Sequence, residues 1–208
     1  MTNDTTEQTV HSEHRDDYGA KLGMWLFLFT EIFFFGGLFL VYAVYRNMHA
    51  SAFEAASTHL NVTVGAINTV FLMVSSMTMS MSVTAVQKNN KGLSAKLIGL
   101  SLLLATAFII NKYFEWDHKI LMGLYPGSEL MLTLDHGYIL FFGLYYCMTG
   151  LHALHIIVGI VLLSICLIKV MSGAINSEKT MLLVNITLYW HLVDLIWIFL
   201  FPMLYLIP

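Results

Sequence analysis

The sequence predicts an all-α integral membrane protein, a bundle of five transmembrane helices. Of its 208 residues, 58% are hydrophobic and 11% are charged, and the mean hydropathy is +0.73. These values lie far from those of an ordinary soluble domain. The apolar residues gather in five long runs, and none of the runs alternates with a period of two over strand-length segments. That pattern favours helices over a β-barrel.

The first helix is expected at residues 22–45, after a polar tail. Residues 1–21 lack the basic start, the short apolar stretch and the small-residue cleavage site of a secretory signal, and predict a mobile cytoplasmic tail. Residues 22–45 span about 36 Å at the helical rise, enough to cross a hydrocarbon core of about 30 Å. Acids and histidines in the tail could buffer protons near a cytoplasmic entrance, or simply be solvated: Glu7, His11, Glu13, His14, Asp16 and Asp17.

Four further helices complete the predicted transmembrane domain, residues 22–208. We place them at about residues 62–86, 93–113, 138–168 and 181–207. The fourth run exceeds what a bilayer needs, so this helix should protrude or tilt.

The longest connection, residues 114–137, should be an ordered interfacial segment. It contains Trp116 and Tyr125, which favour the membrane interface, followed by a Pro–Gly turn.

Charge placement predicts the orientation and excludes one class of partner. The net charge is −3 and the basic residues are scattered, which argues against nucleic-acid binding. With the N-terminus in the cytoplasm, seven basic residues lie inside: Arg15, Lys21, Lys88, Lys91, Lys96, Lys169 and Lys179. Arg46, Lys112 and Lys119 lie outside. The excess of Lys and Arg therefore favours a cytoplasmic N-terminus and an external C-terminus.

Glu31 stands near the middle of the first predicted helix. An ionised carboxylate at that depth costs about 2.5 to 3.5 kcal/mol on insertion scales. Glu31 should therefore be protonated or partnered. It would either join two helices through a hydrogen bond or contact a proton-conducting partner.

Histidines and an acid recur at a spacing of three on the last two helices. His152 and His155 share one face of the fourth helix, and Gly159 allows a neighbouring helix to approach. His191 and Asp194 repeat the spacing on the fifth helix. If these helices form an antiparallel hairpin, His155 and Asp194 reach the same depth, and we expect a hydrogen bond between them.

A metal or haem site is the alternative use of these polar residues. Six side chains could contribute: Glu31, Glu115, His152, His155, His191 and Asp194. The Glu-x-x-His pairs of di-iron bundles and the His-Glu-x-x-His motif of zinc proteases are missing, and spacing alone cannot establish a haem ligand. The sequence therefore favours structural polar contacts, with no metal ligand assigned.

Several motifs carry a resemblance to a known family. They are Gly23–Phe27 through Glu31, Asn68–Thr69, Glu115–Trp116, Thr149–His155 with Gly159, and Tyr189–Asp194 with Trp197. From about Gly23 to its end the chain resembles subunit III of the haem-copper oxidases, most of all cytochrome c oxidase subunit III in its five-helix form. We expect helix-packing roles for Asn68, Ser75, Gly150, Gly159, Trp190 and Trp197.

The resemblance implies a proton-pumping respiratory oxidase in the bacterial cytoplasmic membrane. Such subunits have no active site and bind neither haem nor copper, which reside in partner subunits I and II. They hold phospholipid in a cleft between the first two helices and the rest, and they support proton uptake. Membership of a larger respiratory assembly stays open.

Departures from the family pattern limit what the resemblance implies. Longer members carry two additional helices and a Gln three residues before the acid that corresponds to Glu115, where this chain has Lys112. The short form is shared with quinol oxidase subunit III and with a protein associated with nitric oxide reductases, so these remain alternatives. A self-contained di-iron or haem enzyme is the alternative from another class.

Overall fold

Five membrane-length helices dominate the computed structural model, which describes residues 4–206; the side chains of residues 4–17 and of Leu132 are outside this description. The long helices are α1 (Asp4–Met48), α3 (Val62–Gln87), α4 (Lys91–Leu121), α6 (His136–Met171) and α7 (Met181–Phe201). Within α1 the apolar span is Tyr18–Met48, and α7 continues through the π-helix η1 (Pro202–Leu206). The predicted all-α class with five spans is confirmed.

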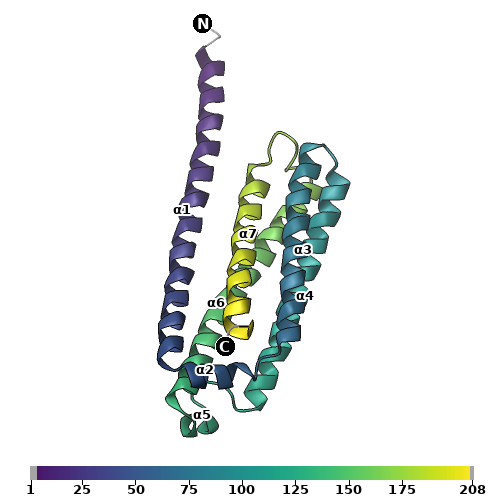
Figure 1. Ribbon diagram of the computed structural model, residues 1–208. Helices are drawn as coiled ribbons and strands as arrows, with labels where there is room; N and C mark the ends of the chain where they lie inside the picture. The colour runs from purple at the N-terminus through teal and green to yellow at the C-terminus, as the bar shows by residue number, and fades with distance from the viewer. Residues whose placement is uncertain (1–3, 207–208) are drawn as a thin grey trace.

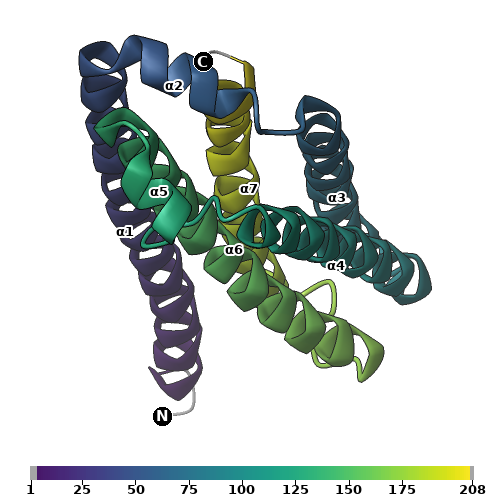
Figure 2. The same ribbon diagram turned by 90° about the horizontal axis from the view of Figure 1, so that it is seen from below.

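Two short helices lie at the end of the bundle opposite the N-terminus (Figure 1). Helix α2 (Ala50–Ser57) runs across that end from α1 towards α3, and α5 (Glu129–Thr133) lies in the connection between α4 and α6 (Figure 2). Helix α2 is fixed by close packing, because Phe53 is fully buried between the rings of Tyr42 and Phe141.

Asparagine and aspartate side chains begin three of the long helices. Asn61 Oδ1 accepts the backbone N–H groups of Thr63 and Val64 at the start of α3, at 3.0 and 3.2 Å. Asn90 Oδ1 accepts the Leu93 N–H at the start of α4, and Asp135 Oδ1 accepts the N–H of the adjacent His136 at the start of α6. These caps satisfy amide groups that a helix start leaves unpaired.

Helix α4 is longer than the hydropathy pattern predicts. The expected end at residue 113 is wrong, because α4 continues to Leu121 and so contains Glu115 and Trp116, which were assigned to the connection. Lys112 and Lys119 form ion pairs with Glu115 at i, i+3 and i, i+4 spacing. Such pairs stabilise a helix and keep the charged residues inside it.

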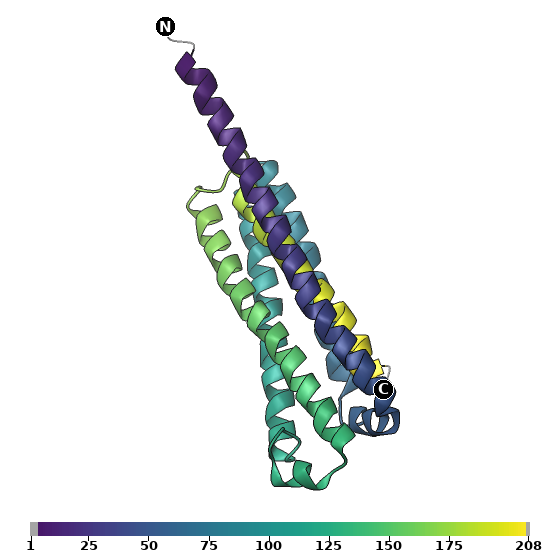
Figure 3. The same ribbon diagram turned by 90° about the vertical axis from the view of Figure 1, so that its left-hand side faces the viewer.

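The first helix also begins earlier than expected. The backbone continues as α1 over residues 4–21, the segment predicted as a polar tail. Its end projects beyond the other helices (Figure 3). The mobility and cytoplasmic side of this segment stay predictions, and the acidic and His side chains assigned to proton buffering lie outside the described side chains.

Helix α7 lies at the centre of the bundle and α1 at its edge. In the most apolar 18-residue windows, 61% of residues are buried in the span of α7 and 11% in that of α1. Helix α3 packs against α4 and α7, and α4 packs against α6. Helix α1 contacts α2, α6 and α7, which leaves most of its apolar surface open (Figure 1).

Candidate functional site

A row of hydroxyl groups joins α3 to the central helix α7. His191 on α7 is hydrogen-bonded through Nδ1 to Ser76 Oγ at 2.5 Å and through Nε2 to Ser80 Oγ at 2.9 Å. The neighbouring Trp190 donates from Nε1 to Ser75 Oγ at 3.0 Å. The two ring nitrogens of His191 are therefore both used for contacts between helices.

The same stretch of α3 joins α4 at close range. Ser75 Oγ donates to the Ser101 carbonyl at 3.3 Å, and Ser101 Oγ donates to the Ser75 carbonyl at 3.1 Å. Thr78 Oγ1 lies 2.6 Å from Ser101 Oγ. Small polar residues let two backbones approach closely in a membrane, so the Ser-rich stretch packs within this chain.

Two glycines of α6 face tryptophan rings. A Cβ on Gly159 would lie 2.7 Å from Trp190 Cε3, closer than side-chain atoms can approach. At Gly150 the corresponding contact, with Trp116, is an ordinary 3.5 Å. Gly159 therefore permits the close approach of α7 to α6.

His152 occupies a sealed position between three helices. Its ring stacks on Trp197 of α7 at 5.3 Å and meets Phe108 of α4 edge-on at 5.7 Å. The residue is fully buried, and neither ring nitrogen has a hydrogen-bond partner among the described residues.

Asn68 lies in the same bundle interior and is fully buried on α3. Its Oδ1 accepts from Asn111 Nδ2 at 2.9 Å, which joins α3 to α4. The adjacent Thr69 accepts the Trp197 Nε1–H at 3.0 Å. The pair Asn68–Thr69 therefore links α3 to two helices.

Glu115 lies at the centre of a buried charged cluster towards the end of the bundle opposite the N-terminus. Its Oε2 accepts from Lys112 Nζ at 3.1 Å, and its Oε1 accepts from Lys119 Nζ at 2.9 Å. Two tyrosine hydroxyls also donate to Oε1, from Tyr145 of α6 at 2.8 Å and from Tyr205 of η1 at 2.6 Å. We call these five residues the outer cluster.

The outer cluster holds two basic side chains and one acid in a dry environment. Lys112 and Lys119 are each 3% exposed and Glu115 is 9% exposed. The Lys112 ammonium also lies 4.9 Å from the ring centre of Trp197 and 5.3 Å from that of Tyr205. Aromatic faces attract a desolvated cation, so the rings share in its stabilisation.

Glu31 ties α1 to α6 near the middle of the membrane span. Its Oε2 lies 3.1 Å from His155 Nε2, while His155 Nδ1 lies 2.7 Å from the Leu151 carbonyl. A carbonyl oxygen accepts and cannot donate, so Nδ1 carries a hydrogen. His155 Nε2 therefore accepts from a protonated Glu31, or donates as an imidazolium to the carboxylate. In both arrangements one proton lies between the two side chains.

The predicted hydrogen bond between His155 and Asp194 is wrong, because both ring nitrogens of His155 have other partners. The residue of α7 that bonds to His155 is Tyr189, whose hydroxyl donates to the His155 carbonyl at 3.0 Å. Asp194 is buried, and its Oδ1 has no hydrogen-bond partner among the described residues. The spacing gave the depth but not the rotation of each helix about its own axis.

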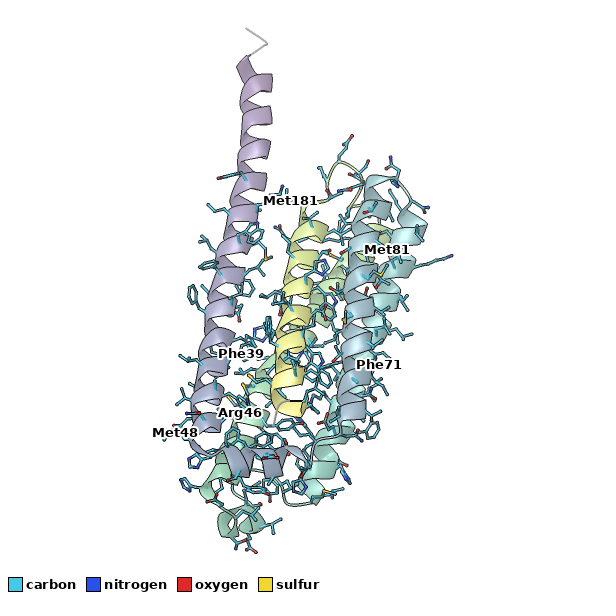
Figure 4. The ribbon with its side chains drawn as sticks, viewed as in Figure 1. Phe39, Arg46, Met48, Phe71, Met81 and Met181 are labelled. Carbon is cyan, nitrogen blue, oxygen red and sulfur yellow. The ribbon has the colours of Figure 1, made fainter. Side chains whose placement is uncertain are left out.

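Two apolar pockets lie along α1, one beside the Glu31–His155 contact and one further along the helix. Together we call them the α1 groove. One part, of about 310 Å³, is lined by Met24, Phe27, Glu31, Leu154, His155, Val158, Leu162 and Tyr189. The other part is lined by Ile32, Phe35, Gly36, Phe39, Leu192, Leu195, Ile196 and Phe199. Figure 4 shows Phe39 between α1 and α7.

The position of the α1 groove differs from that expected of the lipid cleft. The resemblance implied a cleft between the first two transmembrane helices and the rest. The second of these, α3, instead packs against α4 and α7 within the bundle, and α1 alone forms the separate wall. The hydroxyl groups of α3 explain this, because they bond to α4 and α7.

The six candidate metal ligands are dispersed in the structure. Within the part of the chain that the structure describes, no three His, Cys, Asp or Glu side chains lie close enough together to hold a metal ion. Glu31 and His155 form a pair by themselves, and the partners of Glu115 and His191 are lysine, tyrosine and serine side chains. The arrangement can hold helices together and can carry one shared proton at Glu31 and His155.

Comparison with known families decides the affiliation. The family model for cytochrome c oxidase subunit III matches residues 1–207, nearly the whole chain. The chain belongs to the cytochrome c oxidase subunit III family. Subunits of this family are parts of haem-copper oxidases, and the resemblance predicted from the sequence motifs is confirmed.

The names of relatives in the subunit III family indicate different electron donors, cytochrome c in some and quinol in others. The chain is 30% identical over 200 residues to cytochrome c oxidase subunit 3 of Thermostichus vulcanus, which covers 95% of this chain and 91% of that protein. It is 25% identical over 196 residues to the cytochrome bo(3) ubiquinol oxidase subunit 3 of Pseudomonas aeruginosa, covering 93% of this chain and 88% of that protein.

One relative contains subunit III within a longer chain. The haem-copper oxidase subunit I+III of Aeropyrum pernix is 28% identical over 193 residues, which make up 90% of this chain and 22% of that protein. This chain therefore spans about a fifth of the fused relative.

Most of the outer cluster was missed by sequence reasoning. Glu115 was singled out, but Lys112 and Lys119 were interpreted as external charges and Tyr145 and Tyr205 were not considered. The i, i+3 and i, i+4 spacing of the two lysines around Glu115 was the available signal. The tyrosines come from distant parts of the chain and left no such signal.

Proposed function

We propose that this chain is a non-redox accessory subunit of a proton-pumping cytochrome c oxidase in aerobic respiration. The observation that carries the proposal is the family match over residues 1–207. The subunit would stabilise the haem and copper bearing subunit I, with subunit II completing the complex. The internal polar contacts support this role, because most of them join helices of the chain to one another.

Subunit I is the proposed direct partner. In the Aeropyrum pernix relative, subunits I and III share one polypeptide, which supports their adjacency. The outward side of α1 offers a large apolar surface for a membrane neighbour, with Trp25, Phe29 and Phe33 each at least 59% exposed.

Phospholipid is the second proposed partner, in the α1 groove. Both parts of the groove are lined almost entirely by apolar side chains, and they run along the membrane span of α1. Acyl chains match such walls in shape and polarity. Longer family members have two additional helices, which are expected to lie beside this groove. In this chain, bound lipid would fill that space.

We further propose a bacterial cytoplasmic membrane location with the N-terminus inside. The α3–α4 and α6–α7 connections lie at the N-terminal end of the bundle (Figure 1). The basic residues in or next to these connections are Lys88, Lys91, Lys169 and Lys179. Lys112 and Lys119 no longer count as external loop charges, because they are buried in the outer cluster. The excess of basic residues at the N-terminal end is thus larger than the sequence indicated, which supports this orientation. In that orientation the N-terminal segment would lie on the side of proton uptake.

The electron donor is tested on the native complex. A tag on this chain would be used to purify the complex, whose subunits are identified by mass spectrometry and whose visible spectrum is recorded. We expect haem-copper subunits I and II and faster oxidation of reduced cytochrome c than of quinol. Oxidation of quinol alone would move the chain to the quinol oxidase branch. If the tagged chain is instead purified together with a nitric oxide reductase, it would be a protein associated with that enzyme and not an oxidase subunit.

A further inference from the structure

Four side chains of α3 and α7 form a continuous hydrogen-bonded chain. The Ser76 hydroxyl is bonded to His191 Nδ1 at 2.5 Å and also to the carboxyl of Asp194, one turn further along α7. His191 Nε2 is bonded to Ser80 Oγ at 2.9 Å. The order is therefore Asp194, Ser76, His191 and Ser80, and each step crosses from one helix to the other.

The two ends of this chain lie in different surroundings. Asp194 is 7% exposed, and its Oδ1 has no hydrogen-bond partner among the described residues. Ser80 is exposed and lines, together with His191, a pocket of about 220 Å³ between α3 and α7. Val83 and Val184 line the same pocket, which places it towards the N-terminal end of the bundle (Figure 1). The chain thus connects a buried carboxyl to an open pocket.

The surroundings of Asp194 favour the protonated acid. An ionised carboxylate inside a membrane is costly without a counter-charge, and no described side chain of opposite charge forms an ion pair with Asp194. An imidazolium at His191 would stand beyond Ser76, and the attraction between two separated ions does not offset the cost of desolvating both. In the favoured arrangement, neutral Asp194 donates to Ser76, and Ser76 donates to neutral His191.

Every member of the chain can pass a proton on. A hydroxyl both donates and accepts, and a neutral imidazole accepts at one nitrogen while it donates at the other. When Asp194 gives its proton to Ser76, Ser76 gives its own to His191 Nδ1, which leaves a carboxylate and an imidazolium. The Nε2 proton of the imidazolium can then leave to water that enters the pocket, and the reverse steps protonate Asp194 again.

The order of the side chains differs from that of a hydrolase. In a Ser-His-Asp triad the imidazole stands between the hydroxyl and the carboxyl, and it activates the serine as a nucleophile. Here the Ser76 hydroxyl stands between the other two groups and is bonded to both. The arrangement therefore suits proton transfer and not acyl transfer.

We propose that Asp194 is a reversible proton-binding site, which exchanges its proton with the α3–α7 pocket through Ser76 and His191. The site is separate from the Glu31–His155 contact, which joins α1 to α6. The proposal rests on the hydrogen-bonded chain and on the membrane span of α7, and not on which oxidase contains the subunit.

The test uses infrared spectroscopy on a film of the native complex, prepared from cells supplied with isotope-labelled aspartate. The C=O band of a protonated aspartate is shifted by this label, and it shifts again when heavy water replaces ordinary water and the acid exchanges its proton. We expect a band with both properties to disappear in Asp194→Asn. Asp194→Glu keeps the acid but takes its band out of the set that labelled aspartate shifts, which gives the same assignment if the Asn variant does not assemble.

Two serine variants of α3 separate proton transfer from folding. Ser76→Ala interrupts the chain and leaves Asp194 and His191 in place. Ser82→Ala is the matched control, because it removes a buried hydroxyl that bonds to the Met79 carbonyl of its own helix. In Ser76→Ala the Asp194 band should exchange in heavy water at least roughly tenfold more slowly, the effect of about one lost hydrogen bond on a rate. Ser82→Ala should keep the original rate.

Three results would overturn the proton-binding proposal. If Asp194→Asn and Asp194→Glu remove no aspartate band, Asp194 is ionised and holds no proton. A band that never exchanges in heavy water would mean that the acid has no access to the pocket. Equal exchange rates in Ser76→Ala and Ser82→Ala would mean that the proton takes another route. Subunit composition is measured on the same samples, so a failure of the accessory-subunit proposal would appear separately as a missing catalytic subunit.

Discussion

Lys112 is the residue at which this chain departs most clearly from the pattern of longer family members. A basic side chain there would be unfavourable alone, since an unpaired charge buried in a membrane is costly. In this chain the ammonium has Glu115 and the Tyr205 hydroxyl at 3.1 and 2.7 Å, together with three aromatic faces. The local surroundings therefore explain how a lysine is tolerated.

The outer cluster predicts unequal costs for its members. Glu115→Gln leaves two buried ammonium groups without a counter-charge and should cost about 3 to 5 kcal/mol of stability. Lys112→Gln should cost about 1 to 3 kcal/mol, because Glu115 keeps Lys119 and both tyrosine hydroxyls. Thermal unfolding of the purified protein in detergent checks the order. Equal losses in the two variants would argue against Glu115 as the centre of the cluster.

If the shared proton lies on Glu31, the Glu31–His155 contact requires a hydrogen bond and no charge. In Glu31→Gln the amide can donate to His155 Nε2, so α1 should stay attached. Glu31→Leu leaves Nε2 unpaired, which should cost about 1 to 3 kcal/mol. Amide hydrogen exchange of α1 in the purified complex measures the effect. Faster exchange in Glu31→Gln, equal to that of Glu31→Leu, would mean that an ion pair is required.

At the residue scale, the sequence identified polar side chains that are unusual in a membrane span, but it did not identify their hydrogen-bond partners. Glu31, His155 and His191 stand out because polar groups are rare in apolar runs. The assignment of His155 to Asp194 failed because a hydrogen bond depends on helix rotation, which a spacing of three cannot determine. The actual partners are Glu31 for His155 and Ser76 for His191, which lie 124 and 115 residues away in the sequence.

At the scale of helices, α1 differs from the other four spans. Among the polar contacts between α1 and the bundle are three at different depths: Asn185 with the Ala20 carbonyl, Glu31 with His155, and Tyr42 with the Met203 carbonyl. The two parts of the α1 groove lie between these levels. A molecule bound in either part of the groove would therefore lie between two of these polar contacts.

The packing of α6 against α7 predicts opposite behaviour of two glycines on α6. A Cβ at Gly159 would collide with the buried Trp190, whereas one at Gly143 meets nothing within 4 Å. Gly159→Ala should destabilise the protein by about 1 to 3 kcal/mol. Gly143→Ala should be neutral or slightly stabilising, because Ala is the better helix former. A thermal scan of both purified variants compares them, and equal midpoints would contradict this close approach.

Helix existence was predictable here and helix ends were less so. Long apolar runs identify five spans because backbone groups in hydrocarbon must be satisfied within a helix. Hydropathy ended the third span at residue 113, because the scale counts Lys112, Glu115 and Lys119 as exposed charges. Their mutual pairing, invisible to hydropathy, carries α4 to Leu121.

At the scale of the whole molecule, the distribution of basic residues predicts the orientation. Cys147 and Cys166 would first be replaced by serine, and single cysteines then placed at Asn89 and at Thr58. A membrane-impermeant maleimide applied to spheroplasts should label the cysteine at Thr58, at the α2 end, and not that at Asn89. Labelling of Asn89 alone would indicate the inverted orientation.

The central claim is that the buried polar side chains join helices and hold no redox centre. The most direct measurement is the metal content of each polypeptide after the native complex is separated into its subunits. We predict that haem iron and copper stay with the other subunits and that this chain carries less than about one metal ion per ten molecules. Iron or copper retained in equal amount by this chain would contradict the account.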